Sequence, residues 1–196
     1  MIDVVFPELP VLPVDVAWLD ADGRRALADE IEGELRDVER VVRRCEARTA
    51  ALLDLAERSG VVGLDGHRSV GSFAAATVNW SNAECTRLAR VVGLIRALPQ
   101  IADDLDRGAI AVAPVRELAR LRANPRCGDL LAGDSADALI QAAKDLPFEQ
   151  FRLVALEWEK RADADGAHQG HEAAHAGRRV STATLDDTFH LSAQFG

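Results

Sequence analysis

One long helical pattern constrains this chain more than any other feature of its sequence. From Arg24 to Ser59, apolar or small residues recur every three or four positions with charged residues between them, and Gly60 ends the pattern. The series is Leu27, Ile31, Leu35, Val38, Val42, Cys45, Thr49, Leu52 and Ala56. A helix of this length must bury its apolar side. We therefore expect it to pack within its own domain or against a partner helix, including that of a second copy.

Shorter helices are predicted after this long one, because start signals recur along the chain. Ser81-Asn82-Ala83-Glu84 has the spacing of a capping box, and Pro99, Pro114 and Pro147 each suit the opening of a helix. Aromatic residues make up only 5% of the chain, which favours close-packed helices over a sandwich of strands. The fold class predicted is mainly α, a multi-helix domain with one long N-terminal helix, several short helices and a C-terminal β-hairpin.

Composition divides the chain into four parts. Residues 1–23 are expected to form an extended, proline-containing arm, and residues 24–161 the helical domain. Residues 162–177 are rich in Ala, Gly, Asp and His and are expected to form a linker. Residues 178–196 alternate with period two around Asp186-Asp187-Thr188, which predicts a β-hairpin at the start of a truncated segment.

The position of the protein in the cell is predicted from what the sequence lacks. The three cysteines are isolated and odd in number, which favours reduced thiols over a disulfide framework. The N-terminal residues show neither a signal peptide nor a membrane span. We expect a cytoplasmic protein without a membrane partner.

The middle of the chain is its only basic part. Residues 67–127 carry nine arginines and five acidic residues, whereas the whole chain has a net charge of −9. Five arginines of two short helices are candidate DNA contacts, namely Arg87, Arg90, Arg116, Arg120 and Arg122. The alternative is that these side chains form salt bridges with acidic residues of the long helix, for which Glu32, Glu34, Asp37 and Glu39 are candidates.

One motif suggests metal chemistry. His171-Glu172-Ala173-Ala174-His175 matches the H-E-x-x-H pattern, in which two histidines bind zinc and the glutamate activates water. Glycines flank it, no apolar face accompanies it, and His190 is the one histidine that follows. We therefore predict no metal site and no cofactor, with His171 and His175 as weak candidate ligands and a zinc hydrolase as a remote alternative.

The order of several motifs resembles a known family. A long Arg/Glu/Leu/Ala helix precedes Ser69-Val70-Gly71-Ser72-Phe73. The chain continues with Trp80-Ser81-x-x-Glu84, Leu94-x-x-x-Leu98-Pro99 and Leu105-x-x-Gly108. A helix near Pro114 follows and, after the linker, Arg178-Arg179-Val180-Ser181. Over roughly residues 24–196 this resembles the actinobacterial domain of unknown function 222, the thirteen-E-twelve repeat family.

The resemblance implies a helical domain of the kind that commonly precedes an HNH endonuclease module. That module uses histidines, an asparagine and often paired CxxC zinc ligands, none of which this sequence contains in that arrangement. The family's usual Asp-Gly at the hairpin is replaced by Asp186-Asp187. The expectation is a non-catalytic domain of an HNH-nuclease-associated protein that contacts DNA through its arginine-rich centre. The alternative is a protein–protein interaction or oligomerisation module.

Overall fold

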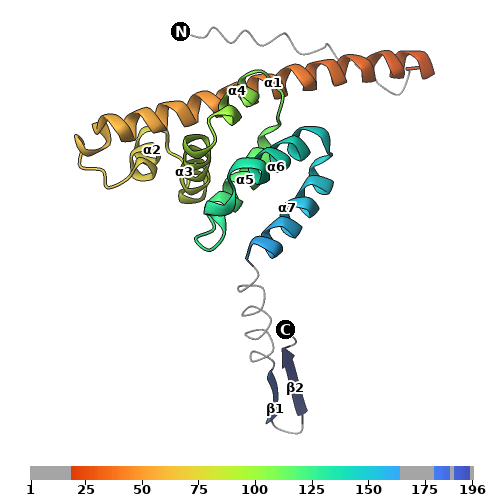
Figure 1. The fold of residues 1–196 in the computed structure, drawn as a ribbon. Coiled ribbons are helices and arrows are strands. Elements are labelled where there is room, and N and C mark those ends of the chain that lie inside the picture. The colour runs from red at the N-terminus through yellow and green to blue at the C-terminus, as the bar shows by residue number, and fades with distance from the viewer. Residues whose placement is uncertain (1–18, 164–178, 186–187, 195–196) are drawn as a thin grey trace. The chain divides into compact units, whose positions relative to one another are not determined.

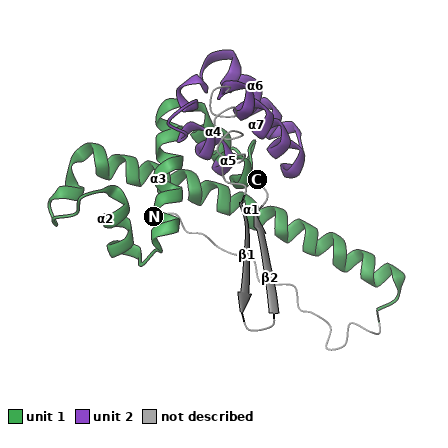
Figure 2. Ribbon diagram, turned by 90° about the horizontal axis from the view of Figure 1, so that it is seen from below, with its two compact units in different colours: residues 1–115 green, residues 116–196 purple. Residues whose placement is uncertain are grey.

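The computed structural model describes residues 19–163, 179–185 and 188–194, and it is mainly helical (Figure 1). Contacts between residues divide the chain into two compact units, Met1–Val115 and Arg116–Gly196 (Figure 2). The domain borders expected at residues 23, 161 and 177 stay predictions. The expected arm, apart from its last five residues, and nearly all of the expected linker lie outside the described residues.

The long helix α1 spans Ala21–Ser59. It begins three residues before the expected Arg24 because Asp20 caps it, its carboxylate accepting a hydrogen bond of 2.7 Å from the Gly23 amide. Gly60 ends it with a left-handed φ of 77°, a conformation that glycine adopts without strain. The prediction of one long N-terminal helix is confirmed.

The remaining helices of unit 1 lie along one part of α1. The 3₁₀ turn η2 spans Val61–Gly63, and helices α2 (Val70–Val78), α3 (Asn82–Ala97) and α4 (Gln100–Asp106) follow. α1 contacts α2, α3 and α4, and all its buried side chains belong to its C-terminal half. The N-terminal part of α1 extends beyond the other helices of this unit (Figure 1).

Serine caps set the starts of α2 and α3. Ser69 accepts from the Ser72 amide at 3.1 Å while the Ser72 hydroxyl accepts from the Ser69 amide, which makes a reciprocal capping box. Ser81 accepts from the Glu84 amide at 3.2 Å, but the Glu84 carboxylate accepts from Arg87. The capping box expected at Ser81 is therefore only half formed, because a nearby guanidinium competes for the glutamate.

Helix α5 spans Val112–Arg122, and the division between the units falls within it. Pro114 is the third residue of α5 and not, as was expected, the first. Proline is tolerated there because the backbone nitrogens of the opening turn donate no hydrogen bond within the helix. Unit 2 continues with the 3₁₀ turn η3 (Gly128–Leu130) and the paired helices α6 (Gly133–Asp145) and α7 (Phe148–Ala162).

Only part of the face of α7 that carries its large apolar residues lies in the core. Phe151 is fully buried, whereas Phe148 and Val154 are exposed and Trp158 is half-buried. The Trp158 indole donates a hydrogen bond of 2.6 Å to the Ser135 hydroxyl of α6. Helical spacing puts all four on one side of α7, but only Phe151 of them is fully buried.

Two strands are described near the C-terminus. β1 (Arg179–Leu185) and β2 (Thr188–Gln194) pair antiparallel, with Arg179 opposite Gln194 and Leu185 opposite Thr188. The residues expected to form the turn, Asp186 and Asp187, lie outside the described residues. That the two strands form a hairpin belonging to the helical domain stays a prediction.

Candidate interaction surface

Helix α1 has two different apolar faces, and unit 1 buries the one with smaller side chains. The buried residues are Glu46, Ala47, Ala50, Leu53 and Ala56. Alanines at this spacing allow a neighbouring helix to approach closely, and α3 and α4 both contact α1. The buried core of these two partners includes Leu88, Val91 and Leu94 of α3 and Ile101 and Leu105 of α4.

The other face of α1 carries larger apolar residues and is exposed. Ile31, Leu35, Val38, Val42 and Leu52 are each between 39% and 63% exposed, and Cys45 is exposed as well. Isolated apolar residues on a surface are common, but a continuous row of them marks an interaction site. Of the two expected alternatives, packing within its own domain is not observed for these six residues, and of the whole series only Ala56 at its end is buried.

The spacing of the exposed face is that of a coiled-coil seam. Intervals of four and three alternate from Ile31 to Leu52, so the residues fall on the a and d positions of a heptad repeat. We call this set the α1 stripe: Ile31, Val38, Cys45 and Leu52 at d, and Leu35, Val42 and Thr49 at a. It runs for about 32 Å along the helix.

Charged residues flank the α1 stripe on both sides. On the e side, the three glutamates each face an arginine of the same chain; the pairs are Glu32–Arg36 at 2.7 Å, Glu39–Arg43 at 3.1 Å and Glu46–Arg87 at 3.5 Å. On the g side, Glu34 and Arg48 form no ion pair or hydrogen bond with any residue that the structure describes. The charges of the e side are therefore balanced internally, whereas Glu34 and Arg48 remain available to a partner.

Arg87, one of the candidate DNA contacts, is turned toward α1. Its guanidinium contacts the carboxylate of Glu84 within α3 and that of the buried Glu46 on α1. A carboxylate at a buried position needs such a partner, because an unpaired charge there is costly. The alternative that arginines pair with the acidic first helix is observed for this residue, although Glu46 was not among the expected partners.

A second arginine of α3, Arg96, also pairs with carboxylates of α1, which the sequence did not predict. It donates to Asp54 at 2.6 Å and to Glu57 at 2.8 Å. The hydrogen bond from Arg96 holds the pKa of Asp54 below its usual range. Sequence spacing offered no signal for this pairing, since about forty positions separate the partners.

Three of the remaining candidate DNA contacts also have partners within the protein. Arg120 donates to both carboxylate oxygens of Glu159, at 3.0 and 2.7 Å, and to Glu117 at 2.9 Å. These hydrogen bonds, that of Glu159 first, raise the pKa of Arg120 above its usual value. Arg122 pairs with Asp129, and Arg116 also has an interaction partner. DNA contact through these residues stays a prediction, and it would require the pairs to open.

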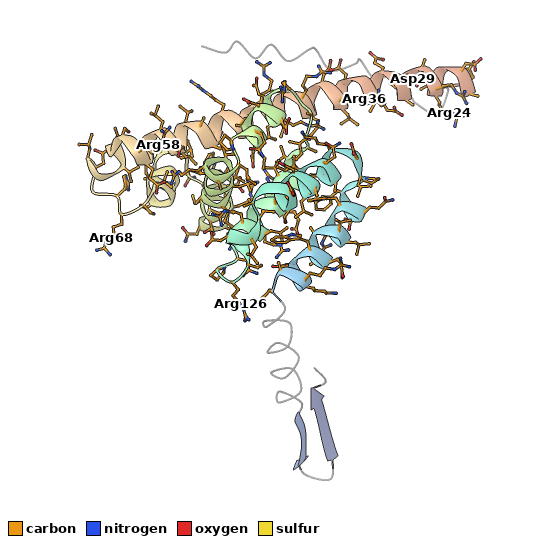
Figure 3. All side chains as sticks on the ribbon, in the orientation of Figure 1. Arg24, Asp29, Arg36, Arg58, Arg68 and Arg126 are labelled. Carbon is orange, nitrogen blue, oxygen red and sulfur yellow. The ribbon has the colours of Figure 1, made fainter. Side chains whose placement is uncertain are left out.

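Arg90 differs from the other four. It is exposed on α3 and makes no ion pair or hydrogen bond among the described residues. Arg48 of α1 and Arg68, which precedes α2, are exposed in the same way, and Figure 3 shows Arg68 extending from its loop. These three side chains of unit 1 are free to meet an anionic partner.

Unit 2 contains an apolar groove of its own. It lies between α6 and α7, has a volume of about 630 Å³, and is lined by Leu139, Leu153, Val154 and Trp158 among others. Leu153 at its rim is 68% exposed. The groove is wide open and carries few polar groups, so it offers an apolar contact rather than a site for chemistry.

The structure adds little to the metal and thiol predictions. His171, Glu172 and His175 lie outside the described residues. Among residues that are described, no group of three potential ligands is placed to hold a metal ion. Cys85 and Cys127 are buried free thiols, and burial raises the pKa of the Cys127 thiol. No helix within the described part of the chain has the length and apolar character needed to cross a bilayer.

Comparisons with protein-family models, with curated proteins and with solved structures find no match for this chain. The resemblance to the domain of unknown function 222, the HNH association and the cytoplasmic location therefore stay predictions.

Proposed function

We propose that this chain is a non-catalytic protein–protein interaction module that binds a partner helix along the α1 stripe. The observation that supports this most is the a/d seam from Ile31 to Leu52, of which unit 1 leaves every residue exposed except the half-buried Thr49. The helix that presents it is anchored through its buried C-terminal half. A preformed helix loses little conformational freedom on binding, so a seam of three heptads is sufficient for docking.

The proposal predicts that acidic substitutions in the stripe abolish association without unfolding the protein. In the variant Leu35→Glu/Val42→Glu, two exposed positions would have to bury charges on binding, so we expect the association constant to fall at least about 100-fold. Sedimentation velocity over a wide concentration range measures this, because the chain itself supplies a matching helix. Circular dichroism should show unchanged helicity.

The matched control places the same charges on α1 away from the stripe. Ala26→Glu/Ala51→Glu changes two exposed positions of the same helix and should associate as the wild type does. A wild-type protein that sediments as a monomer at every concentration, or equal association by both double variants, would contradict the proposal.

DNA contact by unit 1 is a second proposal, and it rests on Arg90 together with Arg48 and Arg68. Exposed guanidiniums that pair with no described residue can neutralise phosphates without breaking any salt bridge seen in the described part of the chain. DNA contact is also what the resemblance to the HNH-associated family implies. Catalysis is assigned to no residue of this chain.

The DNA proposal predicts weak binding that depends strongly on salt. Fluorescence anisotropy with a labelled duplex should show that Arg90→Glu/Arg68→Glu weakens binding about 10-fold or more at low salt, with a smaller slope of affinity against salt concentration. Arg36→Glu is the control, because Arg36 is also an exposed arginine of unit 1 but pairs with Glu32. Undetectable binding of the wild type at low salt would exclude DNA as a partner.

A further inference from the structure

We propose that the partner helix is the α1 of a second copy of this chain, and that the two α1 helices run antiparallel with Val38 of one copy beside Val42 of the other. This inference rests on the proposed function and specifies its partner and orientation. It follows from two properties of the stripe, the order of side-chain sizes along it and the charges on its g side.

The sizes of the stripe residues favour the antiparallel orientation. Ile31 and Leu35 are large and lie toward the N-terminal end, whereas Cys45 and Thr49 are small and lie toward the C-terminal end. In an antiparallel pair each a residue faces a d residue of the partner, so Leu35 meets Cys45 and Ile31 meets Thr49. The layers formed within residues 31–49 then join a large side chain to a small one, or two valines, and Leu52 at the end of the stripe faces Ala28, which keeps the helices evenly spaced.

A parallel pair would be uneven along the same stretch. In that orientation each residue faces its own copy, so two Leu35 side chains would share one layer and two Thr49 side chains another. The first layer is bulky and the second is small and polar. The stripe residues from Ile31 to Thr49 are therefore complementary in size to the same residues of an antiparallel second copy.

The unpaired charges beside the stripe point to the same orientation. In an antiparallel pair the g positions face each other across the seam, so Glu34 of each copy lies opposite Arg48 of the other. The two-fold symmetry produces this attractive pair twice. In a parallel pair, Glu34 would instead face Glu39 of the partner, which already pairs with Arg43 of its own chain, and Arg48 would face the apolar Leu53, so no attractive pair would form.

The e side does not oppose this arrangement strongly. Antiparallel pairing brings Glu39 opposite Glu39 and Glu32 opposite Glu46, yet each of these carboxylates already faces an arginine of its own chain. Internal pairing lowers the repulsion between them. The net charge preference is thus set by Glu34 and Arg48, which lack internal partners among the described residues.

Charge reversal tests the orientation. Glu34→Arg should weaken dimerisation roughly 10-fold, because it replaces two attractive pairs by two repulsive ones, and Arg48→Glu should do the same. The double variant Glu34→Arg/Arg48→Glu restores opposite charges across the seam and should return to near wild-type affinity in sedimentation velocity. In a parallel dimer, Glu34→Arg would instead strengthen association by meeting Glu39.

Cross-linking through the native Cys45 provides an independent readout. In the antiparallel register the two Cys45 thiols are about 15 Å apart along the axis, so a bis-maleimide with a shorter span should not join wild-type chains. Leu35→Cys places a second thiol opposite Cys45 of the partner and should give a cross-linked dimer. Adding Cys45→Ser to that variant should remove the product.

The outcomes separate this inference from the proposed function. A wild-type dimer with charge rescue and cross-linking only after Leu35→Cys supports both. A wild-type dimer that is strengthened by Glu34→Arg, that gains nothing from the double reversal, or that cross-links through Cys45 alone overturns the antiparallel inference and leaves the interaction function in place. A protein that stays monomeric in every variant overturns both.

Discussion

Replacing Gly128 with alanine is expected to destabilise unit 2 by about 3 kcal/mol. Gly128 is buried in η3. A Cβ atom built at this position would overlap the carbonyl oxygen of Arg122 and lie 2.8 Å from its carbonyl carbon and 3.2 Å from the Leu121 oxygen. These are backbone atoms at the end of α5, so no side-chain rotation can relieve the overlap. The glycine is required for close approach rather than for an unusual φ.

The measurement is urea unfolding followed by circular dichroism, with Gly93→Ala as the control. Gly93 lies in the interior of α3, and a Cβ atom there would meet nothing within 4 Å. Alanine is the better helix former by about 1 kcal/mol, so this variant should be more stable than the wild type. A Gly128→Ala protein with the wild-type unfolding midpoint would show that the end of α5 can move away, contrary to the prediction.

The helices themselves could be predicted from the sequence because their signals are local. The interval of the apolar residues indicated α1, while Ser81, Pro99 and Pro147 stand at the starts of α3, α4 and α7. Such signals act within one or two turns of chain. They depend on backbone hydrogen bonds and fixed φ values that do not change with the tertiary environment.

Which side of α1 is buried could not be predicted in the same way. The periodicity favoured the residues with the largest side chains, such as Leu35 and Val42, whereas unit 1 buries Ala47 and Ala50. The choice depends on how closely α3 and α4 can approach, which is a property of the pair and not of one helix. The interval of three between Ala47, Ala50 and Leu53 was the only signal available.

The partners of the arginines could not be predicted from the local sequence either. Residues 67–127 are rich in arginine by sequence alone, but a guanidinium pairs with whatever carboxylate the fold brings near. Arg87 reaches Glu46 and Arg120 reaches Glu159, each about forty positions away. A charge count identifies candidates for binding, while only tertiary contacts show that a residue such as Arg90 has no partner within the part of the chain that the structure describes.

Replacing Glu159 with glutamine is expected to destabilise the protein by about 2 kcal/mol at neutral pH. The Glu159 carboxylate accepts two hydrogen bonds from Arg120 and one of 2.9 Å from the Asn124 side chain, and its side chain is only 19% exposed. Glutamine keeps the shape but removes the charge, which leaves the Arg120 guanidinium with Glu117 as its remaining carboxylate. A destabilising effect would identify Arg120 as a residue that holds unit 2 together rather than one kept for DNA.

The same pair makes a prediction about pH. The hydrogen bond from Arg120 lowers the pKa of Glu159 below its ordinary value of 4.5, so the unfolded chain takes up the proton first as the pH falls. The stability that the carboxylate contributes is complete above about pH 4.5 and is lost as the pH drops through the lower pKa of the folded protein. The difference between wild type and Glu159→Gln should therefore be constant near neutral pH and shrink below about pH 4.5.

Glu149→Gln is the matched control on the same helix. The Glu149 side chain is 78% exposed and lies 3.7 Å from Arg152, so its ion pair is screened by water and its loss should change stability by less than about 0.5 kcal/mol. Urea titrations of the wild type and both variants at neutral and acidic pH complete the comparison. If Glu159→Gln were as stable as Glu149→Gln at neutral pH, Arg120 would not depend on Glu159. It could then leave the pair for a phosphate at little cost, and the arginine-rich centre would again be the leading candidate for DNA contact.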